Sequence, residues 1–303
     1  MDKRDLISIL DLSPGKLVEL LSLAADLKGG RCSKSLPGKT LGMIFQKPSH
    51  RTRVSFDVAM YQLGGHAIYL SQGEIGLGTR ESVAATAQVL GRYVDGIVAR
   101  TNSHNDVKEL ARYARVPVIN GLSDKEHPCQ ALADLLTIWE RKGDLRGAKV
   151  AYLGDGNNVA ASLALACAMA GVHFSIASPP DYRLDRVVIG HAGKLASANG
   201  SRIQECEGPR EAVQGADVVY TDVWVSMGQE VEAKRRKGAF AGYRVDEALL
   251  SAAGNGALFM HPLPAHEGEE IAPGLLEHQQ SVVYDQAENR LHMQKAVLLD
   301  LLG

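Results

Sequence analysis

The sequence is poor in features that mark several protein classes. Its 303 residues include four cysteines, Cys32, Cys129, Cys167 and Cys206, with no CxxC pair and no His/Cys spacing suited to zinc. Neither a disulfide framework nor a metal site is therefore expected. We expect the four cysteines to be free thiols in a reducing cytoplasm.

The chain also has little net charge and no long apolar run. A formal charge of -2 provides no basic field for nucleic acid or an anionic membrane surface. No basic segment followed by an apolar stretch opens the sequence, and no apolar run approaches the roughly 18 residues needed to cross a bilayer. We expect a globular, cytoplasmic protein of about two domains, without a nucleic-acid or membrane partner.

Short apolar runs alternate with stretches of helical periodicity along the chain, which is typical of βαβ units and parallel sheets. The sequence therefore predicts an α/β protein with two domains, each a parallel β-sheet flanked by helices. The first group of predicted strands covers 40–45, 66–71, 95–100 and 116–121, and the second covers 148–154, 173–178, 201–206, 216–221, 257–261 and 281–285.

A helix is predicted between the two groups of strands. Leu132, Leu135, Leu136 and Trp139 recur at helical spacing until "KGDLRG" breaks the pattern. We expect this helix to connect the domains. In doubly wound sheets ligands bind beyond the carboxyl ends of the strands, so the residues that directly follow each strand carry the functional prediction.

The segment "KPSHRTR", residues 47–53, joins predicted strand 40–45 to a helix N-terminus. Unpaired backbone N–H groups and the helix dipole favour an anion there, and Ser49, Arg51 and Thr52 add donors. This arrangement predicts a phosphate cradle. The alternative is that Ser49 is a simple N-cap beside solvated basic side chains. The GxxxxGK[ST] pattern of a P-loop is absent.

Further donors follow other predicted elements. Arg100 ends strand 95–100 and is either a second phosphate contact or a rim residue. His127 and Gln130 lie on one face at the start of the connecting helix, where the dipole favours a neutral imidazole that can polarise a carbonyl, or a packed histidine. Arg290 is predicted in the first turn of a C-terminal helix. A cation there opposes the dipole and calls for an anionic partner.

The segment "YLGDGNN", residues 152–158, invites a dinucleotide-binding interpretation that the sequence does not support. Val159 occupies the third glycine position, and the next strand ends in Ser178 instead of a ribose-binding acid. The turn instead offers the amides of Asn157 and Asn158 to the carboxylate or amine of a small substrate.

Two later strands end in further polar segments. Asp222 directly follows strand 216–221 and suits a cationic amine, and Ser226 and Met227 follow in the same loop. The segment "HPLP", residues 261–264, follows strand 257–261. Its prolines stiffen the turn and leave backbone carbonyls as acceptors.

The "HPLP" turn carries two further predictions. The bond between Leu263 and Pro264 is a candidate cis peptide. His261 and His266 are expected to be a packed and a surface histidine, and not metal ligands.

Taken together, these segments resemble the aspartate/ornithine carbamoyltransferase family over essentially the whole chain. The carbamoyl phosphate motif of that family, usually Ser-Thr-Arg-Thr-Arg, corresponds to residues 49–53, and its His-Pro-x-Gln motif corresponds to residues 127–130. The segments "GDGNN" at 154–158 and "DVWVSMGQE" at 222–230 match motifs of the ornithine-type members.

The resemblance implies transfer of the carbamoyl group from carbamoyl phosphate to ornithine, without a metal or organic cofactor. It implies a carbamoyl phosphate domain at 1–137 with the C-terminal helix 287–303 packed back on it, an ornithine domain at 138–286, and a homotrimer. The implied catalytic residues are Arg51, Arg100, His127 and Asp222. The implied ligands of carbamoyl phosphate are Ser49, His50, Arg51, Thr52, Arg100, His127, Gln130, Pro262, Leu263 and Arg290. The implied ligands of ornithine are Asn158, Asp222, Ser226 and Met227.

Three positions depart from the ornithine-type pattern. His50 replaces a threonine, Pro262 replaces a cysteine, and Gly76 stands where many members have a glutamine that reaches the neighbouring subunit. These departures leave open another acceptor, such as aspartate, putrescine or N-acylornithine, or a non-catalytic ligand-binding paralogue. Asp222 argues against aspartate, because a close contact between like charges costs several kcal/mol in typical interfaces.

Overall fold

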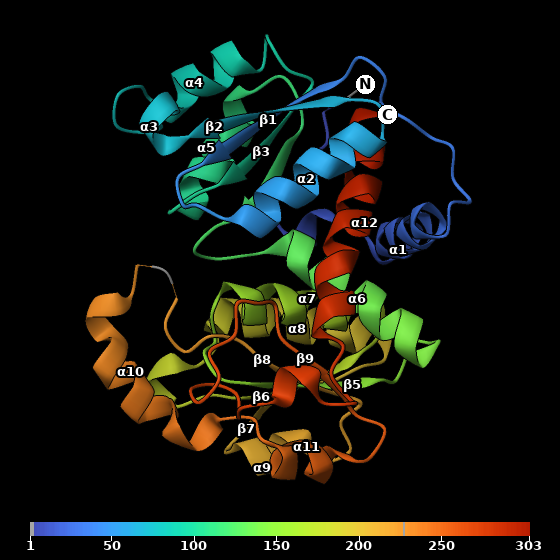
Figure 1. Ribbon diagram of the computed structural model, residues 1–303, viewed down its shortest axis with the longest axis vertical. Helices are drawn as coiled ribbons and strands as arrows, with labels where there is room; N and C mark the ends of the chain where they lie inside the picture. The colour runs from blue at the N-terminus through green and yellow to red at the C-terminus, as the bar shows by residue number, and fades with distance from the viewer. Residues whose placement is uncertain (1–2, 227) are drawn as a thin grey trace. The chain divides into compact units, whose positions relative to one another are not determined.

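The computed structural model describes residues 3–226 and 228–303 (Figure 1). The chain forms two compact units, the first from the residues up to Leu136 together with Asn289–Gly303, and the second from Thr137–Glu288. Both crossings between the units fall inside helices, α6 (Pro128–Lys142) and α12 (Val283–Leu302). The predicted return of a C-terminal helix to the first domain is therefore confirmed.

Within the described residues, the first unit contains a four-stranded parallel sheet in the order β2-β1-β3-β4. Because the chain moves from β1 to one side and then returns to the other, the order reverses between β1 and β3. Such a reversal is where open α/β sheets bind ligands. The strands are β1 (Thr40–Phe45), β2 (His66–Ser71), β3 (Gly96–Arg100) and β4 (Val118–Leu122).

Helices cover this sheet, and several begin at a serine N-cap. Ser49 and Ser82, for example, accept a backbone N–H from the first turn of α2 and α4. The red α12 runs beside the blue α1 (Figure 1), where Lys16 pairs with Asp300 at 3.1 Å. The helical elements are η1 (Ile9–Asp11), α1 (Pro14–Lys28), α2 (His50–Gln62), α3 (Gln72–Ile75), α4 (Val83–Leu90) and α5 (His104–Tyr113).

The second unit contains a five-stranded parallel sheet in the order β7-β6-β5-β8-β9. Its reversal of strand order lies between β5 and β8. The central strands are buried on both faces, which explains their continuous apolar runs. The strands are β5 (Lys149–Leu153), β6 (His173–Ala177), β7 (Ile203–Cys206), β8 (Val218–Thr221) and β9 (Leu258–Met260).

Helix α7 directly follows β5 and is almost wholly buried, in agreement with its alanine-rich sequence. It starts at an asparagine cap and stops at Gly171 in the left-handed conformation. The helical elements of this unit are α7 (Asn158–Ala170), η2 (Pro180–Tyr182), α8 (Arg186–Asn199), α9 (Pro209–Val213), η3 (Glu230–Glu232), α10 (Ala233–Phe240), η4 (Ala241–Tyr243), α11 (Glu247–Ala253) and η5 (Leu275–Glu277).

The predicted fold class is confirmed, and one predicted strand is wrong. Residues 281–285 form no strand, because α12 already begins at Val283 and only Ser281 makes an isolated bridge, to Phe259. A short apolar run cannot be assigned to strand or helix by periodicity alone. The earlier helix start also moves Arg290 out of the first turn, so the prediction that it opposes the helix dipole is wrong.

Two further predictions, on the cysteines and on membrane-spanning segments, can also be compared with the structure. The four cysteines are free thiols, three of them buried. Among the described residues, none of the helices has the length and apolar character needed to traverse a lipid bilayer.

Candidate functional site

The predicted site residues gather at the reversal points of the two sheets, one set in each unit. In the first unit, four residues separate the end of β1 from the start of α2, and Arg100 is the last residue of the neighbouring strand β3. Phe45, which ends β1, lies in register with Arg100. The two elements therefore deliver their polar groups to the same edge of the sheet.

The start of α2 has the geometry of an anion cradle and of an N-cap at once. The Ser49 hydroxyl accepts the Thr52 backbone N–H at 3.4 Å and lies 3.3 Å from the Thr52 hydroxyl. The capping alternative for Ser49 is thus observed. It is compatible with anion binding, because one cap occupies only one of the unpaired N–H groups at a helix start.

Arg290 joins three distant segments of the first unit. Its Nη1 donates to Gln130 Oε1 at 2.7 Å, and its Nη2 donates to Thr52 Oγ1 at 3.2 Å. The Gln130 amide in turn donates to Asp134 at 2.9 Å, which fixes its oxygen toward Arg290. Helices α2, α6 and α12 are therefore linked through one guanidinium group.

The positive charges of Arg51, Arg100 and Arg290 act on one another in this half-site. Burial, together with the positive charges of Arg290 and Arg51, lowers the pKa of Arg100 to about 10. Among residues 3–226 and 228–303, no carboxylate forms an ion pair with Arg51 or Arg100. Positive groups held close together in a partly desolvated site favour a bound anion, which would offset both desolvation and repulsion.

His127 precedes α6 and is buried beside these arginines. Burial holds the pKa of His127 well below its usual value, and the charges of Arg290 and Arg100 act in the same direction. The imidazole is therefore neutral at physiological pH, as the sequence predicts. A neutral ring can donate one N–H to a substrate oxygen without adding charge.

Two of the three residues that depart from the family pattern, His50 and Gly76, belong to the first unit. His50 is exposed, and its Nε2 lies 3.2 Å from Arg51 Nη1. Because guanidinium groups only donate, His50 Nε2 accepts this hydrogen bond. Gly76 ends α3 in the left-handed conformation with φ 59, which glycine adopts at the least cost.

In the second unit, Asn157 connects the ends of β5 and β8. Its side-chain oxygen caps α7 by accepting the N–H groups of Val159 and Ala160 at 2.9 and 3.1 Å. Its amide nitrogen donates to Asp222 Oδ2 at 2.8 Å. Asn157 thus caps α7 and holds Asp222, two contacts that the sequence did not predict.

Asp222 is the acid of this half-site and is buried. Burial raises its pKa, while His261 and the hydrogen bond from Asn157 oppose that shift. Its Oδ1 accepts the Val223 backbone N–H at 2.8 Å. A partly desolvated carboxylate held in one orientation is suited to a cationic amine.

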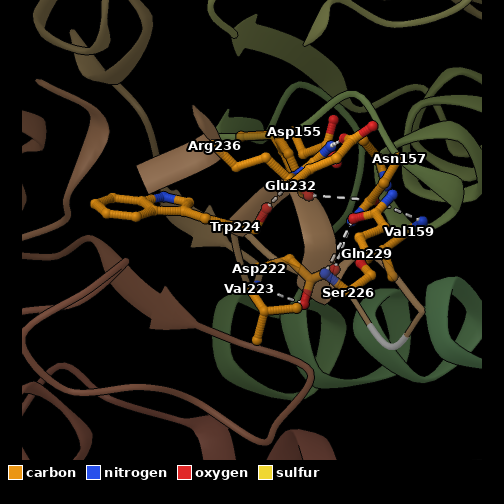
Figure 2. A network of polar contacts seen from close by, with 12 residues as sticks. Asp155, Asn157, Val159, Asp222, Val223, Trp224, Ser226, Gln229, Glu232 and Arg236 are labelled. Carbon is orange, nitrogen blue, oxygen red and sulfur yellow. Dashed lines mark hydrogen bonds and ion pairs between the residues drawn. The ribbon is translucent and has the colours of Figure 1, made fainter. Parts of the chain in front are cut away.

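Figure 2 shows the loop that follows Asp222, with Trp224 on one side and Ser226 near Gln229 on the other. The Ser226 backbone N–H donates to Gln229 Oε1 at 3.1 Å. Asn158 opens α7 and is half-buried. Met227, predicted to bind the acceptor, lies outside the described residues.

The "HPLP" turn follows β9, and the predicted cis peptide between Leu263 and Pro264 is present. Leu263 has φ 54, and its N–H donates to His261 Nδ1 at 3.0 Å. His261 is fully buried and His266 is exposed, as predicted. His266, Glu269 and Glu270 bring possible metal-ligating atoms within 4.8 Å of one another, although Lys237 already pairs with Glu269.

Comparison with known proteins identifies the family of this chain. Residues 4–140 match the family model described as "Aspartate/ornithine carbamoyltransferase, carbamoyl-P binding domain". Residues 146–301 match the model described as "Aspartate/ornithine carbamoyltransferase, Asp/Orn binding domain". The chain belongs to the aspartate/ornithine carbamoyltransferase family.

Relatives within this carbamoyltransferase family match nearly full length. The ornithine carbamoyltransferase of Anoxybacillus flavithermus is 51% identical over 303 residues, covering 99% of this chain and 96% of that protein. The solved ornithine carbamoyltransferase of Pyrococcus furiosus has a TM-score of 0.95 at 51% identity, covering 99% and 97% of the two chains. That of Gloeobacter violaceus has a TM-score of 0.92 at 48% identity, covering 99% of each.

Two polar residues of the second half-site are absent from the sequence predictions. Asp155 follows β5 and Arg236 lies in α10, and their two side chains form a buried ion pair. Asp155 stands inside the "GDGNN" motif of the carbamoyltransferases, which was a usable signal. Arg236 belongs to the basic run 234–237, which by pattern alone is typical of a solvated helix face.

Proposed function

We propose that this protein is an ornithine carbamoyltransferase. It transfers the carbamoyl group of carbamoyl phosphate to the side-chain amine of L-ornithine and releases L-citrulline and phosphate. The near full-length relatives named ornithine carbamoyltransferase support this proposal, and they do not favour aspartate, putrescine or N-acylornithine as acceptor. A non-catalytic role is likewise not favoured.

The observation that carries the proposal is the arginine cluster of the first unit, in which Arg100 and Arg290 are buried and Arg51 is half-buried. Arg51, Arg100 and Arg290 form a positive centre with which a phosphate anion is the natural complement. Their neighbours Ser49, Thr52, His127 and Gln130 supply further donors or fix the arginines. We therefore assign carbamoyl phosphate binding to the domain at 1–137 with the helix 287–303.

In the reaction, the neutral amine attacks the carbonyl carbon of carbamoyl phosphate. A C–N bond forms, the C–O bond to phosphate breaks, and the amine proton leaves with the departing phosphate or solvent. Arg51, Arg100 and His127 donate to the developing oxyanion and to the phosphate, each fixed donor contributing on the order of 3 kcal/mol. Holding the two reactants in orientation supplies much of the remaining acceleration.

The carbamoyl amide also needs acceptors. We assign these to the backbone carbonyls of Pro262 and Leu263, in the turn that His261 holds through the Leu263 N–H. Because the contact uses main-chain oxygens, replacing the family's cysteine by Pro262 preserves it. His50, which accepts from Arg51, takes the place of the usual threonine at the edge of the phosphate group.

Ornithine binding belongs to the domain at 138–286 in this proposal. Asp222 binds a cationic amine of ornithine, and Asn158, Ser226 and Met227 complete the acceptor site. A dicarboxylic acceptor would bring a second carboxylate against buried Asp222, and close like charges oppose binding. The acid therefore selects ornithine over aspartate.

We further propose that the enzyme acts as a cytoplasmic homotrimer. Free thiols at all four cysteines are consistent with a reducing compartment. Sedimentation equilibrium tests the oligomeric state, since a trimer has three times the chain mass of 32.5 kDa.

The central experiment measures citrulline formation by the wild type and by Arg51→Ala. We expect the substitution to lower kcat by roughly a hundredfold, as loss of a transition-state donor does. Arg92→Ala removes an exposed arginine of the same unit and is the control, with unchanged kcat. Wild-type activity in Arg51→Ala would contradict the phosphate assignment.

A panel of acceptors tests substrate choice. Ornithine, aspartate, putrescine and N-acetylornithine are compared at equal concentration with saturating carbamoyl phosphate, and we expect ornithine to give the highest kcat/KM. Faster carbamoylation of another amine would overturn the role of Asp222. Calorimetric binding of both substrates without turnover would indicate a non-catalytic protein instead.

A further inference from the structure

Arg236 is a buried cation on a helix whose other basic residues are exposed. It is 4% exposed in α10, whereas Lys234, Arg235 and Lys237 face solvent. Its guanidinium lies over the Tyr182 ring at 4.7 Å and over the Phe240 ring at 5.7 Å. Such stacking fixes the plane of the guanidinium group and therefore the direction of its donors.

Those donors reach both sides of the strand reversal in the second sheet (Figure 2). Arg236 Nη2 donates to Asp155, which follows β5. Arg236 Nε donates to the Trp224 backbone carbonyl at 2.6 Å, in the loop that follows β8. The Trp224 ring also stacks on Phe240, with centroids 6.0 Å apart, so the loop is held by its main chain and by its side chain.

The same loop carries Asp222, two residues before Trp224, and Ser226, two residues after it. Asp222 is fixed from the other direction by the Asn157 amide at 2.8 Å. Arg236 and Asn157 therefore hold the acidic loop at separate points. A shift of the Trp224 carbonyl would change where both acceptor groups lie.

Arg236 also balances the charge of this buried region. The pKa of Asp155 is raised to about 6, because burial and the negative charge of Asp222 outweigh the lowering effect of Arg236. Two buried acids thus share the neighbourhood of one buried cation. Removing that cation would leave like charges facing each other in a site of low dielectric.

We propose that Arg236 is a positioning residue for the acceptor amino acid. By holding the Trp224 carbonyl and Asp155, it places the loop that carries Asp222 and Ser226, and so sets the affinity for ornithine without touching it. This inference rests on the proposed function and deepens it by adding a residue that determines acceptor binding.

The test compares two substitutions of Arg236 with matched controls. Arg236→Met removes the charge and both donors, whereas Arg236→Lys keeps the charge and can still pair with Asp155 but cannot also donate to the Trp224 carbonyl. Arg235→Met and Arg235→Lys alter the adjacent exposed residue, which pairs with Asp181 at 3.1 Å on the surface. Steady-state kinetics give KM for each substrate separately, and thermal unfolding confirms that each variant is folded.

We expect KM for ornithine to rise by about tenfold or more in Arg236→Met and by a smaller factor in Arg236→Lys, in line with couplings inside buried networks. KM for carbamoyl phosphate should stay within about twofold, as should both constants in the Arg235 variants. If Arg236→Met does not fold, Arg236→Lys carries the test alone.

Two results would overturn the inference. One is an unchanged KM for ornithine in the folded Arg236 variants. The other is a parallel rise in both KM values, which would indicate a general structural role. If the wild type forms no citrulline, both the proposed function and this inference are wrong. If the wild type forms citrulline and the Arg236 variants have an unchanged KM for ornithine, only this inference is wrong.

Discussion

Asn157 donates its side-chain amide to Asp222 at 2.8 Å while its oxygen caps α7. One residue thus ties the N-terminus of a helix to the acid proposed to bind ornithine. The bond lowers the pKa of Asp222 against the effect of burial. The side chain that starts the helix therefore also favours the ionised form of Asp222.

Asn157→Asp should move the acid limb of kcat/KM for ornithine to higher pH. The new carboxylate can still cap α7, but it places a like charge beside Asp222 and raises the pKa of Asp222 further. Because Asp222 binds an amine only when ionised, binding is then lost at a higher pH as the solution is acidified. The pH profile measures this shift. Ser82→Asp, at the N-cap of α4, is the control, and an unshifted acid limb in Asn157→Asp would contradict the role of Asp222.

Arg290→Met should weaken carbamoyl phosphate binding. It removes a buried cation together with the hydrogen bonds to Gln130 and Thr52, and loss of charged hydrogen bonds corresponds to roughly tenfold to hundredfold in affinity. Isothermal titration with carbamoyl phosphate or inorganic phosphate provides the measurement. Arg92→Met, at an exposed position, should bind as the wild type does. Equal affinity of Arg290→Met and Arg92→Met would show that Arg290 is only structural.

His127→Gln should change how stability depends on pH. Since burial depresses the pKa of His127 below 6.5, the unfolded chain takes up a proton there on acidification while the folded protein does not. The wild type therefore loses stability as pH falls below 6.5, and the variant lacks this loss. As the pH falls below 6.5, the difference in unfolding free energy between the wild type and His127→Gln should therefore narrow by up to about 1.4 kcal/mol per pH unit.

Urea unfolding at pH 7.5, 6.5 and 5.5 checks this prediction, with protein concentration held constant because assembly adds to stability. His191→Gln substitutes an exposed histidine and is the control. A difference between wild type and His127→Gln that stays constant with pH would show that His127 is protonated in the folded protein.

Gly76→Ala should be destabilising, although an added methyl group is small. Gly76 has φ 59, and a Cβ there would lie 2.6 Å from the Arg80 Cβ. The expected loss is about 1 kcal/mol or more. Gly73→Ala, in the same short helix with nothing within 4 Å, is the matched control and should be neutral or stabilising. Equal unfolding midpoints for the two variants would contradict the view that the backbone conformation at position 76 favours glycine.

Much of the fold follows from local sequence. Alternating apolar runs and helical periodicity are set by backbone geometry within about ten residues, so they predicted both parallel sheets and the α6 connection. Where the local signal is ambiguous the prediction failed, as at residues 281–285, because a short apolar run fits a buried strand and a helix start equally well.

The chain also determined which chemical groups the protein would use. The donors of "KPSHRTR", the acid after β8 and the carbonyls of the "HPLP" turn are fixed by residue type and by their position after a strand. What only the tertiary structure decided is which of these groups share partners. Arg290 meets Gln130 and Thr52 across 160 and 238 residues, and Arg236 meets Asp155 across 81. Such pairings depend on packing and burial between distant segments, which no local pattern records.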